Sequence, residues 1–200
     1  SGYYKTSNDV GVFGRISFLI FIVVLGIESA RQTVARLKKG RRVEELEQFA
    51  LNDSMTGMYN RNAYDYFVKN EKDFEGYVIV TFDLNNLKQC NDQYGHRAGD
   101  EYIINAAHII EDNFERYGKC YRIGGDEFCC IIPKGRYFKI ERVMHKIDQD
   151  VEILNHKNII PVPVGIAYGY AVFTADDTDP EKVRERADED MYRNKKTMKQ

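Results

Sequence analysis

The stretch YRIGGDEFCCII, at positions 121–132, contains the feature on which the fold prediction depends. Its first three and last five residues are rich in β-branched and aromatic side chains, which predicts two strands. Gly124 and Gly125 separate them and predict a hairpin turn, because glycine reaches the positive φ angles of such turns. Asp126 and Glu127 follow the turn directly. Two carboxylates beside bare backbone favour a site that a bulky, metal-bound ligand approaches, although an exposed acidic hairpin has the same composition.

Composition places the chain among globular α/β proteins. It has 200 residues, a formal net charge of −2 and 4 prolines, which fits one domain with an extension. A near-neutral chain has no basic field for nucleic acid, so we expect no nucleic-acid partner. The cysteines form no CxxC pair and no zinc-type spacing with histidine, and we expect core thiols in a reducing cytoplasm. They are Cys90, Cys120, Cys129 and Cys130. Because the chain begins with Ser, we expect it to be a piece of a longer protein.

The first fifty residues differ in character from the rest. Residues 16–27, ISFLIFIVVLGI, are an apolar run, and its extension back to Val10 adds only Arg15 as a charge. Twelve residues are fewer than the roughly 20 that span a bilayer. Six basic residues follow between positions 31 and 42, as the positive-inside rule expects of a cytoplasmic flank. The pattern favours the cytoplasmic end of a transmembrane helix in the cell (inner) membrane over the alternatives, a buried or dimer-forming helix or a secretory signal.

An amphipathic helix is predicted from Glu28 to about Leu51, because apolar residues recur there at spacings of three and four. Such a helix is suited to a short coiled coil that connects the membrane segment to the remainder. We therefore divide the chain into residues 1–50, an apolar segment plus linker helix, and residues 51–200, a catalytic domain.

Helices and strands alternate in the second part. The patterns predict, in chain order, a helix at 61–69, a strand at 77–84, a polar segment before a helix at 99–114, the hairpin, a helix at 136–154, a strand at 162–173 whose glycines suggest a bend, and a helix at 180–194. Because one clear hairpin accompanies these helices, a mixed sheet with helices packed on it is favoured over a purely parallel sheet.

Acidic residues are predicted at the ends of two strands. Asp83 ends the strand at 77–84, and Asp126 and Glu127 begin the second hairpin strand. If these strands are neighbours, the carboxylates converge at one edge of the sheet. Clustered hard oxygen ligands suit Mg²⁺ or Mn²⁺, and two such ions can organise a phosphoryl displacement. Lys88, five residues after Asp83, would reach the phosphates.

Four ordered blocks resemble the GGDEF-domain family, the diguanylate cyclases. RIGGDEF at 122–128 is similar to the family signature. DSMTGMYNR at 53–61, FDLNNLKQCNDQYGHRAGD at 82–100 and ADEDMYRNKK at 187–196 resemble the segments that accompany it. The resemblance implies a palm-like α+β fold, with a central, mostly antiparallel sheet flanked by helices.

The resemblance also implies roles at the matching positions. Asp83, the backbone carbonyl of Leu84, Asp126 and Glu127 would bind metal, and Asp126 would also help to activate a 3′-hydroxyl. Lys88 would neutralise charge that develops on the phosphates.

The same resemblance implies substrate contacts. Asn91 and Asp100 would read guanine, whose N1–H and N2–H₂ form a donor pair that adenine lacks, and His96 lies in the same segment. Lys195 would bind phosphate, and Gly124 and Gly125 would admit the nucleotide. By themselves, a lone histidine and a lysine run at a helix end are more typical of a solvated surface.

The chain departs from the family pattern at several positions. Asn85 and Leu87 stand where the family often has Asp and Phe, and the closing Gly-Arg-Asn is absent, with Lys199 near the position of its Arg. Glu115 and Gly118 occupy the positions of an R-x-x-D product-inhibition site that many members carry. We therefore expect that site to be absent here.

The resemblance implies a membrane-tethered diguanylate cyclase that condenses two GTP molecules into cyclic di-GMP, releases two pyrophosphates and acts as a homodimer. The alternative is a catalytically silent module that binds GTP or dimerises and regulates a partner.

Overall fold

The computed structural model describes residues 14–19, 21–34, 50–135 and 139–198, without the side chains of 196–198. The chain divides into two compact units, Ser1–Gln48 and Phe49–Gln200. Most of the predicted linker helix falls on residues 35–49, which lie outside the described residues, as does Lys199.

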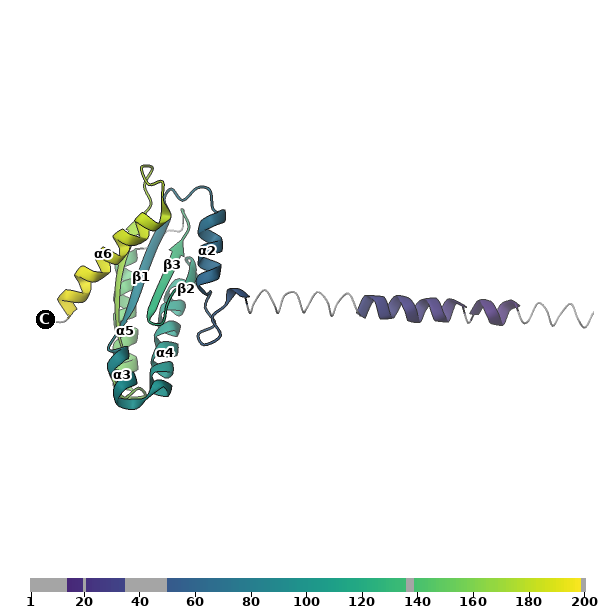
Figure 1. Ribbon diagram of the computed structural model, residues 1–200, viewed down its shortest axis with the longest axis horizontal. Helices are drawn as coiled ribbons and strands as arrows, with labels where there is room; N and C mark the ends of the chain where they lie inside the picture. The colour runs from purple at the N-terminus through teal and green to yellow at the C-terminus, as the bar shows by residue number, and fades with distance from the viewer. Residues whose placement is uncertain (1–13, 20, 35–49, 136–138, 199–200) are drawn as a thin grey trace, which may run out of the picture. The chain divides into compact units, whose positions relative to one another are not determined.

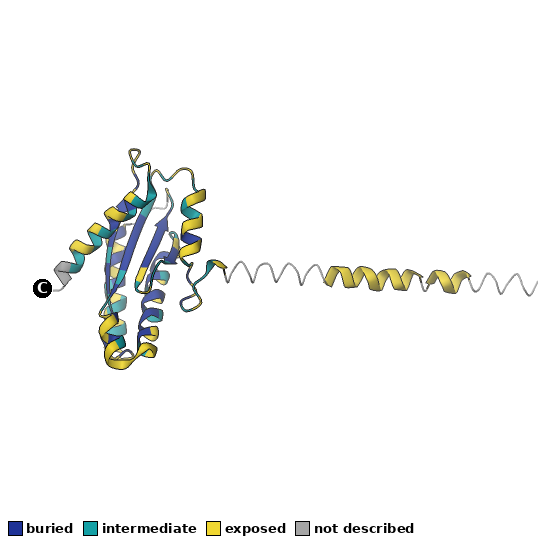
Figure 2. Cartoon of the chain, viewed as in Figure 1, coloured by how far each residue is buried: buried dark blue, intermediate teal, exposed yellow. Residues whose placement is uncertain are grey.

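Residues 14–19 and 21–34, the described part of the first unit, form the helix Gly14–Val34. It is 21 residues long and contains an 18-residue window with a mean hydropathy of 1.5, so by length and composition it is long and apolar enough to cross a membrane. Its apolar side chains are exposed, as Figure 2 shows, with Phe18 and Leu19 each 62% accessible.

The second unit is built on an antiparallel sheet. Its strands are β1 (Val78–Asn85), β2 (Lys119–Arg122), β3 (Glu127–Ile132) and β4 (Gly165–Val172). They are arranged in the order β2-β3-β1-β4, and every neighbouring pair is antiparallel. The predicted antiparallel sheet with flanking helices is confirmed, and β1 lies beside the hairpin formed by β2 and β3.

Helices cover both faces of this sheet (Figure 1). They are α2 (Arg61–Asn70), α3 (Leu87–Tyr94), α4 (His96–Phe114), α5 (Ile140–His156) and α6 (Pro180–Met198). One core lies under α4 and α5 and includes Phe82, Phe114, Phe128 and Ile147. The other lies under α2 and α6 and includes Tyr64, Ile79, Tyr121 and Val183. Figure 2 shows the strands as the buried centre of the domain. The four cysteines are buried free thiols, as predicted.

The alternation of side chains along β1 decides which face receives Asp83. Phe82 and Leu84 point into the core under α4 and α5. Ile79 points to the opposite face, toward α2 and α6. Because side chains alternate along a strand, Asp83 shares the face of Ile79. The carboxylate at the end of β1 is therefore directed toward α6.

The polar segment after β1 is helical, which corrects the sequence prediction. α3 begins only two residues after β1, and α4 begins at His96 rather than near Gly99. Asn86 makes this abrupt change possible because it adopts a left-handed conformation, with φ of 64°. Gly95, with φ of 83°, then separates the two helices.

The predicted reason for the glycines of the hairpin is wrong. Gly124 and Gly125 are absent from the glycines with positive φ, which are Gly57, Gly76, Gly95 and Gly135. The loop is closed instead by the amides of Ile123 and Gly124, which donate to the Glu127 carbonyl oxygen at 2.9 and 3.2 Å.

Gly169, in the middle of β4, has a packing role. A Cβ atom on Gly169 would lie 2.1 Å from the backbone nitrogen of Met191 in α6. Only glycine therefore allows α6 to approach β4 this closely.

Candidate active site

The two strand ends that carry the predicted acidic residues are neighbours in the sheet. Asp83 of β1 and Glu127 of β3 are directly opposite in the antiparallel register, so their side chains share one face. The Leu84 amide donates to the Asp126 carbonyl oxygen at 3.0 Å, which attaches the hairpin loop to the end of β1. Three acidic residues thus lie at one edge of the sheet.

Arg122 holds the loop between β2 and β3 in place. Its Nε donates to the Gly124 carbonyl oxygen at 3.2 Å and its Nη2 to that of Gly125 at 2.9 Å. Its Nη1 lies 3.0 Å from Oδ1 of Asp53, in the DSMTG segment. Sequence reasoning quoted both residues within motifs but assigned neither a role. An arginine two residues before a glycine pair was the available signal, because its fork matches two adjacent carbonyls.

Lys195 forms an ion pair with Oδ1 of Asp83 across the space between α6 and β1. Both side chains are largely shielded, with 26% and 21% accessible. Hydrogen bonds from α6 to the outer edge of β4 fix the position of this helix turn: Asn194 donates to the Tyr168 carbonyl oxygen at 3.1 Å, and the Tyr170 amide donates to Asp190 at 3.2 Å. The predicted phosphate-binding lysine therefore faces the predicted metal ligand.

Asn91 and Asp100 lie on adjoining helices that are in close contact. A Cβ atom on Gly99 would be 1.9 Å from Oδ1 of Asn91. The residue before Asp100 must therefore be glycine for the Asn91 side chain to lie where it does. Asp100 itself is exposed in the second turn of α4.

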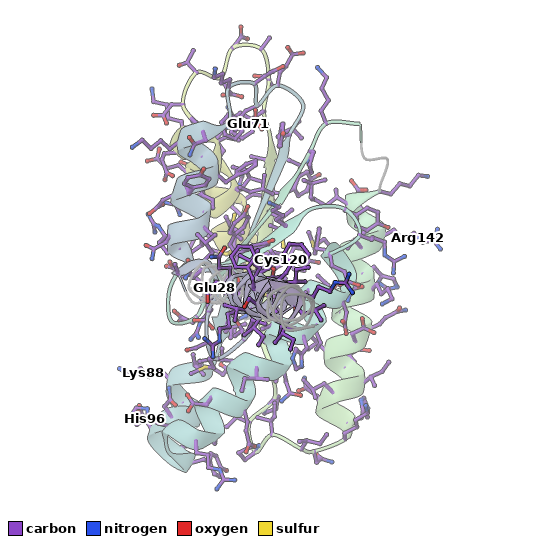
Figure 3. The ribbon with its side chains drawn as sticks, turned by 90° about the vertical axis from the view of Figure 1, so that its right-hand side faces the viewer. Glu28, Glu71, Lys88, His96, Cys120 and Arg142 are labelled. Atoms are coloured by element: carbon purple, nitrogen blue, oxygen red, sulfur yellow. The ribbon has the colours of Figure 1, made fainter. Side chains whose placement is uncertain are left out.

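Lys88 and His96 are exposed at the same end of the domain (Figure 3). Lys88 is the second residue of α3, and His96 is the first residue of α4. The α3–α4 hairpin, residues 87–114, thus carries four of the predicted site residues, which are Lys88, Asn91, His96 and Asp100. This hairpin begins two residues after the end of β1, the strand that carries Asp83.

A second polar cluster lies between α6 and the strands β1 and β3 of the sheet. A cavity of about 260 Å³ between α6 and the sheet is lined by Thr81, Glu127, Arg184 and Asp188, among others. Burial raises the pKa of Asp188, although Arg184, at 3.2 Å, and Thr81 act in the opposite direction. Sequence reasoning missed Arg184, because a charged residue on a helix is usually solvated.

The carboxylates at this edge of the sheet are the candidate ligands of a metal ion. Among the described residues, no group of three or more His, Cys, Asp or Glu side chains is arranged to hold a metal ion. Asp83 accommodates a positive charge, since it accepts the Lys195 ammonium group, and Glu127 lies beside it in the register. These hard oxygen donors fit a divalent cation that takes its remaining ligands from phosphates and water.

The comparisons with known proteins agree with this geometry. Residues 50–200 match the family described as diguanylate cyclase, GGDEF domain. The chain is 31% identical over 147 residues to the bifunctional diguanylate cyclase/cyclic di-GMP phosphodiesterase MucR of Pseudomonas aeruginosa, covering 69% of this chain and 22% of MucR. It is 28% identical over 158 residues to the diguanylate cyclase DgcS of Shewanella oneidensis, covering 76% of this chain and 52% of DgcS. The chain thus spans about half or less of these relatives.

A solved structure shares the fold. The coiled coil and GGDEF domain of DgcB from Caulobacter crescentus, in complex with c-di-GMP, matches with a TM-score of 0.71 and 23% identity. The match covers 86% of this chain and 95% of that one. The family match extends over three quarters of the sequence and includes every element of the sheet. The chain therefore belongs to the GGDEF-domain diguanylate cyclase family.

Proposed function

We propose that the domain condenses two molecules of GTP into cyclic di-GMP and releases two pyrophosphates. One observation carries the proposal: the acidic strand end and the predicted guanine-reading helices are consecutive in the chain, with β1 ending at Asn85 and α3 beginning at Leu87. A nucleotide that extends from the α3–α4 hairpin toward α6 would place its base near Asn91 and Asp100. Its phosphates would then lie near Asp83 and Lys195.

The chemistry is a pair of identical phosphoryl transfers. The 3′-hydroxyl oxygen of one GTP attacks the α-phosphorus of the other, and the new O–P bond forms as the bond to pyrophosphate breaks. Asp126 would accept the hydroxyl proton, and Lys88 and Lys195 would offset the charge on the phosphates. A bound Mg²⁺ or Mn²⁺, held by Asp83, Glu127, Asp126 and the Leu84 carbonyl, would supply electrostatic stabilisation. Most of the rate enhancement would come from positioning.

Each domain would bind one GTP, so two domains must meet with their sites facing. We propose that the homodimer forms through the linker before residue 50 and that Gly14–Val34 anchors the chain in the cell membrane, with the catalytic domain in the cytoplasm. The DgcB structure, which includes a coiled coil with its GGDEF domain, supports a linker of this kind.

A second candidate is a silent module that binds GTP without turnover. The ion pair between Lys195 and Asp83 is the observation in its favour, because the lysine ammonium group occupies a carboxylate oxygen that a metal ion would need.

Turnover of GTP separates the two candidates. The 200-residue chain in detergent would be incubated with GTP and Mg²⁺, and pyrophosphate and cyclic di-GMP would be measured. We expect both products in a 2:1 ratio. Binding of GTP with neither product would favour the silent module.

The dimer requirement has its own test. We expect residues 49–200 alone to show a rate per domain that rises with protein concentration. A version with residues 1–40 replaced by an in-register coiled coil should be more active at the same dilute concentration. A concentration-independent rate in the isolated domain would contradict catalysis between domains.

A further inference from the structure

Tyr102, a fully buried residue of α4, has a hydroxyl group that contacts the backbone of two strands. It donates to the Asn85 carbonyl oxygen at 2.5 Å and accepts from the Gly165 amide at 2.7 Å. The Pro163 carbonyl oxygen lies farther away, at 3.3 Å. A phenol has one proton, so the shorter contact identifies Asn85 as its main acceptor. Burial raises the pKa of Tyr102 to about 12, so the hydroxyl keeps this proton at neutral pH.

The two backbone partners are the last residues that β1 and β4 share. Asn85 and Gly165 are directly opposite at the end of the β1–β4 ladder. Asn85 follows Asp83 and Leu84, the predicted metal ligands of β1. A single side chain from α4 therefore holds the strand end that carries these ligands.

The same helix carries the predicted guanine contact. Asp100 precedes Tyr102 by two residues, and Asn91 of α3 lies against Gly99 of α4. The α3–α4 hairpin also packs on the core through apolar residues such as Leu87 and Ile103. Apolar contacts are not directional, whereas a hydrogen-bonded hydroxyl at 2.5–2.7 Å specifies a distance.

We propose that Tyr102 is a positioning residue that sets the spacing between the guanine-reading helices and the metal-binding end of β1. The inference rests on the proposed function, since it assigns Tyr102 to the placement of the same nucleotide. Without the hydroxyl, α4 keeps its apolar packing but loses its directional attachment to the strand end. The base contacts of Asp100 and Asn91 are then no longer held in register with the phosphate contacts.

The test is the Tyr102→Phe variant, which keeps the buried ring and removes one oxygen atom. Binding of α,β-methylene GTP and α,β-methylene ATP, which cannot release pyrophosphate, would be measured by calorimetry with Mg²⁺. We expect the preference for the guanine nucleotide to fall by about tenfold, since misplacement by 1 Å can cost up to roughly 100-fold. We also expect KM for GTP to rise in proportion.

The matched control is Asn155→Ala. Asn155 of α5 bonds both backbone groups of Val164, next to Gly165, at 2.7 and 2.9 Å. These two hydrogen bonds fix the residue before β4 and involve no residue of α4. We expect this control to lose stability but to keep its guanine preference. A loss of preference in Asn155→Ala equal to that of Tyr102→Phe would reduce Tyr102 to a structural role.

A second variant keeps the inference testable if Tyr102→Phe does not fold. A Cβ atom on Gly165 would lie 3.2 Å from Cβ of Asn85, so Gly165→Ala presses the two strand ends apart while Tyr102 stays intact. We expect a smaller loss of guanine preference in the same direction. If Tyr102→Phe folds and keeps the wild-type preference for the guanine nucleotide, the positioning role is overturned while the proposed function stands. If Tyr102→Phe does not fold, the same result with Gly165→Ala overturns it. A wild-type chain with no guanine preference would overturn the guanine site and this inference together.

Discussion

Arg122 and Asp53 form an ion pair between positions 69 residues apart, with Nη1 of the arginine 3.0 Å from Oδ1 of the aspartate. The pair joins the DSMTG segment to the β2–β3 hairpin, whose Gly124 and Gly125 carbonyl oxygens accept from the rest of the same guanidinium group. The same Oδ1 also accepts from the Thr56 amide at 2.9 Å and from its hydroxyl at 2.8 Å. The shape of the hairpin therefore depends on a residue of a distant motif.

We expect Asp53→Asn to lower the free energy of unfolding by about 1–3 kcal/mol at pH 7, because Arg122 loses its counter-ion in a mostly buried position. Burial alone would raise the pKa of Asp53, but hydrogen bonds from Thr56 and Arg122 hold it below its usual value. A carboxyl group whose pKa is lower in the folded state than in the unfolded state stabilises the fold at any pH above its unfolded-state pKa. This contribution is lost as the pH falls through its folded-state pKa. The difference between wild type and variant should therefore shrink below about pH 4.

Urea denaturation at several pH values measures this difference. Asp65→Asn is the control, since Asp65 pairs with Arg61 on the surface of α2 with 55% of its side chain accessible. We expect almost no change there, as is usual for exposed pairs. A pH-independent deficit in Asp53→Asn would show that its charge is not what stabilises the hairpin.

Sequence patterns predicted the strands and most helices because their apolar residues recur with clear periods. The strand predicted at 77–84 is β1, displaced by one residue, and the convergence of its Asp83 with the hairpin follows from the observed register. The blocks shared with the family also singled out Asn91 and Asp100, but only the helix that carries Asp100 was predicted.

What the sequence could not predict depends on tertiary contacts. α3 is eight residues long and mostly polar, so its two buried side chains, Leu87 and Cys90, are too few to show a period. In the sequence, Tyr102 looks like any other core aromatic residue, because the backbone partners of its hydroxyl are known only from the structure. Gly124 and Gly125 looked like conformational necessities, but neither has a positive φ, and the loop is held by backbone hydrogen bonds to Glu127 and by Arg122.

Asp126→Ala should abolish pyrophosphate release while the domain stays folded. The Asp126 backbone carbonyl oxygen accepts a hydrogen bond from the Leu84 amide, and this bond remains when the side chain is replaced. Only the carboxylate, proposed to bind metal and accept the hydroxyl proton, is lost. Pyrophosphate release and thermal unfolding would be measured together, with Asp126→Asn as the isosteric comparison. Near-normal release by either variant would show that Asp126 is not the metal ligand or the base.

Asp100→Ala should weaken GTP binding and erode the preference over ATP, because the N1–H and N2–H₂ donors of guanine lose their acceptor. A site built to bond such groups discriminates strongly through them. Calorimetric titration with both nucleotides measures the preference, and metal affinity should change less. Asp112→Ala provides the control, as Asp112 is an exposed carboxylate of the same helix. Unchanged selectivity in Asp100→Ala would assign the guanine contact elsewhere.

The structure gives a steric reason to expect no R-x-x-D product site. A Cβ atom on Gly118 would lie 2.1 Å from the Ile131 carbonyl oxygen, so the backbone leaves no room for an aspartate side chain there. Glu115, at the position of the family arginine, is exposed and would repel phosphates. A basic cavity of about 710 Å³ lies nearby between α4 and α5, with Arg116 and Arg142 among its lining residues.

We therefore expect cyclic di-GMP to inhibit the enzyme only by competing with GTP. Initial rates of a forced dimer would be measured against GTP at several concentrations of cyclic di-GMP, and the lines should share one maximal rate. Gly118→Ala would be tested for folding, since even a methyl group collides with β3. Inhibition that GTP cannot overcome would show that a product site exists despite Glu115 and Gly118. If that inhibition disappeared in Arg142→Ala, the product site would lie in the basic cavity. A guanidinium group binds phosphate through paired hydrogen bonds that alanine cannot make.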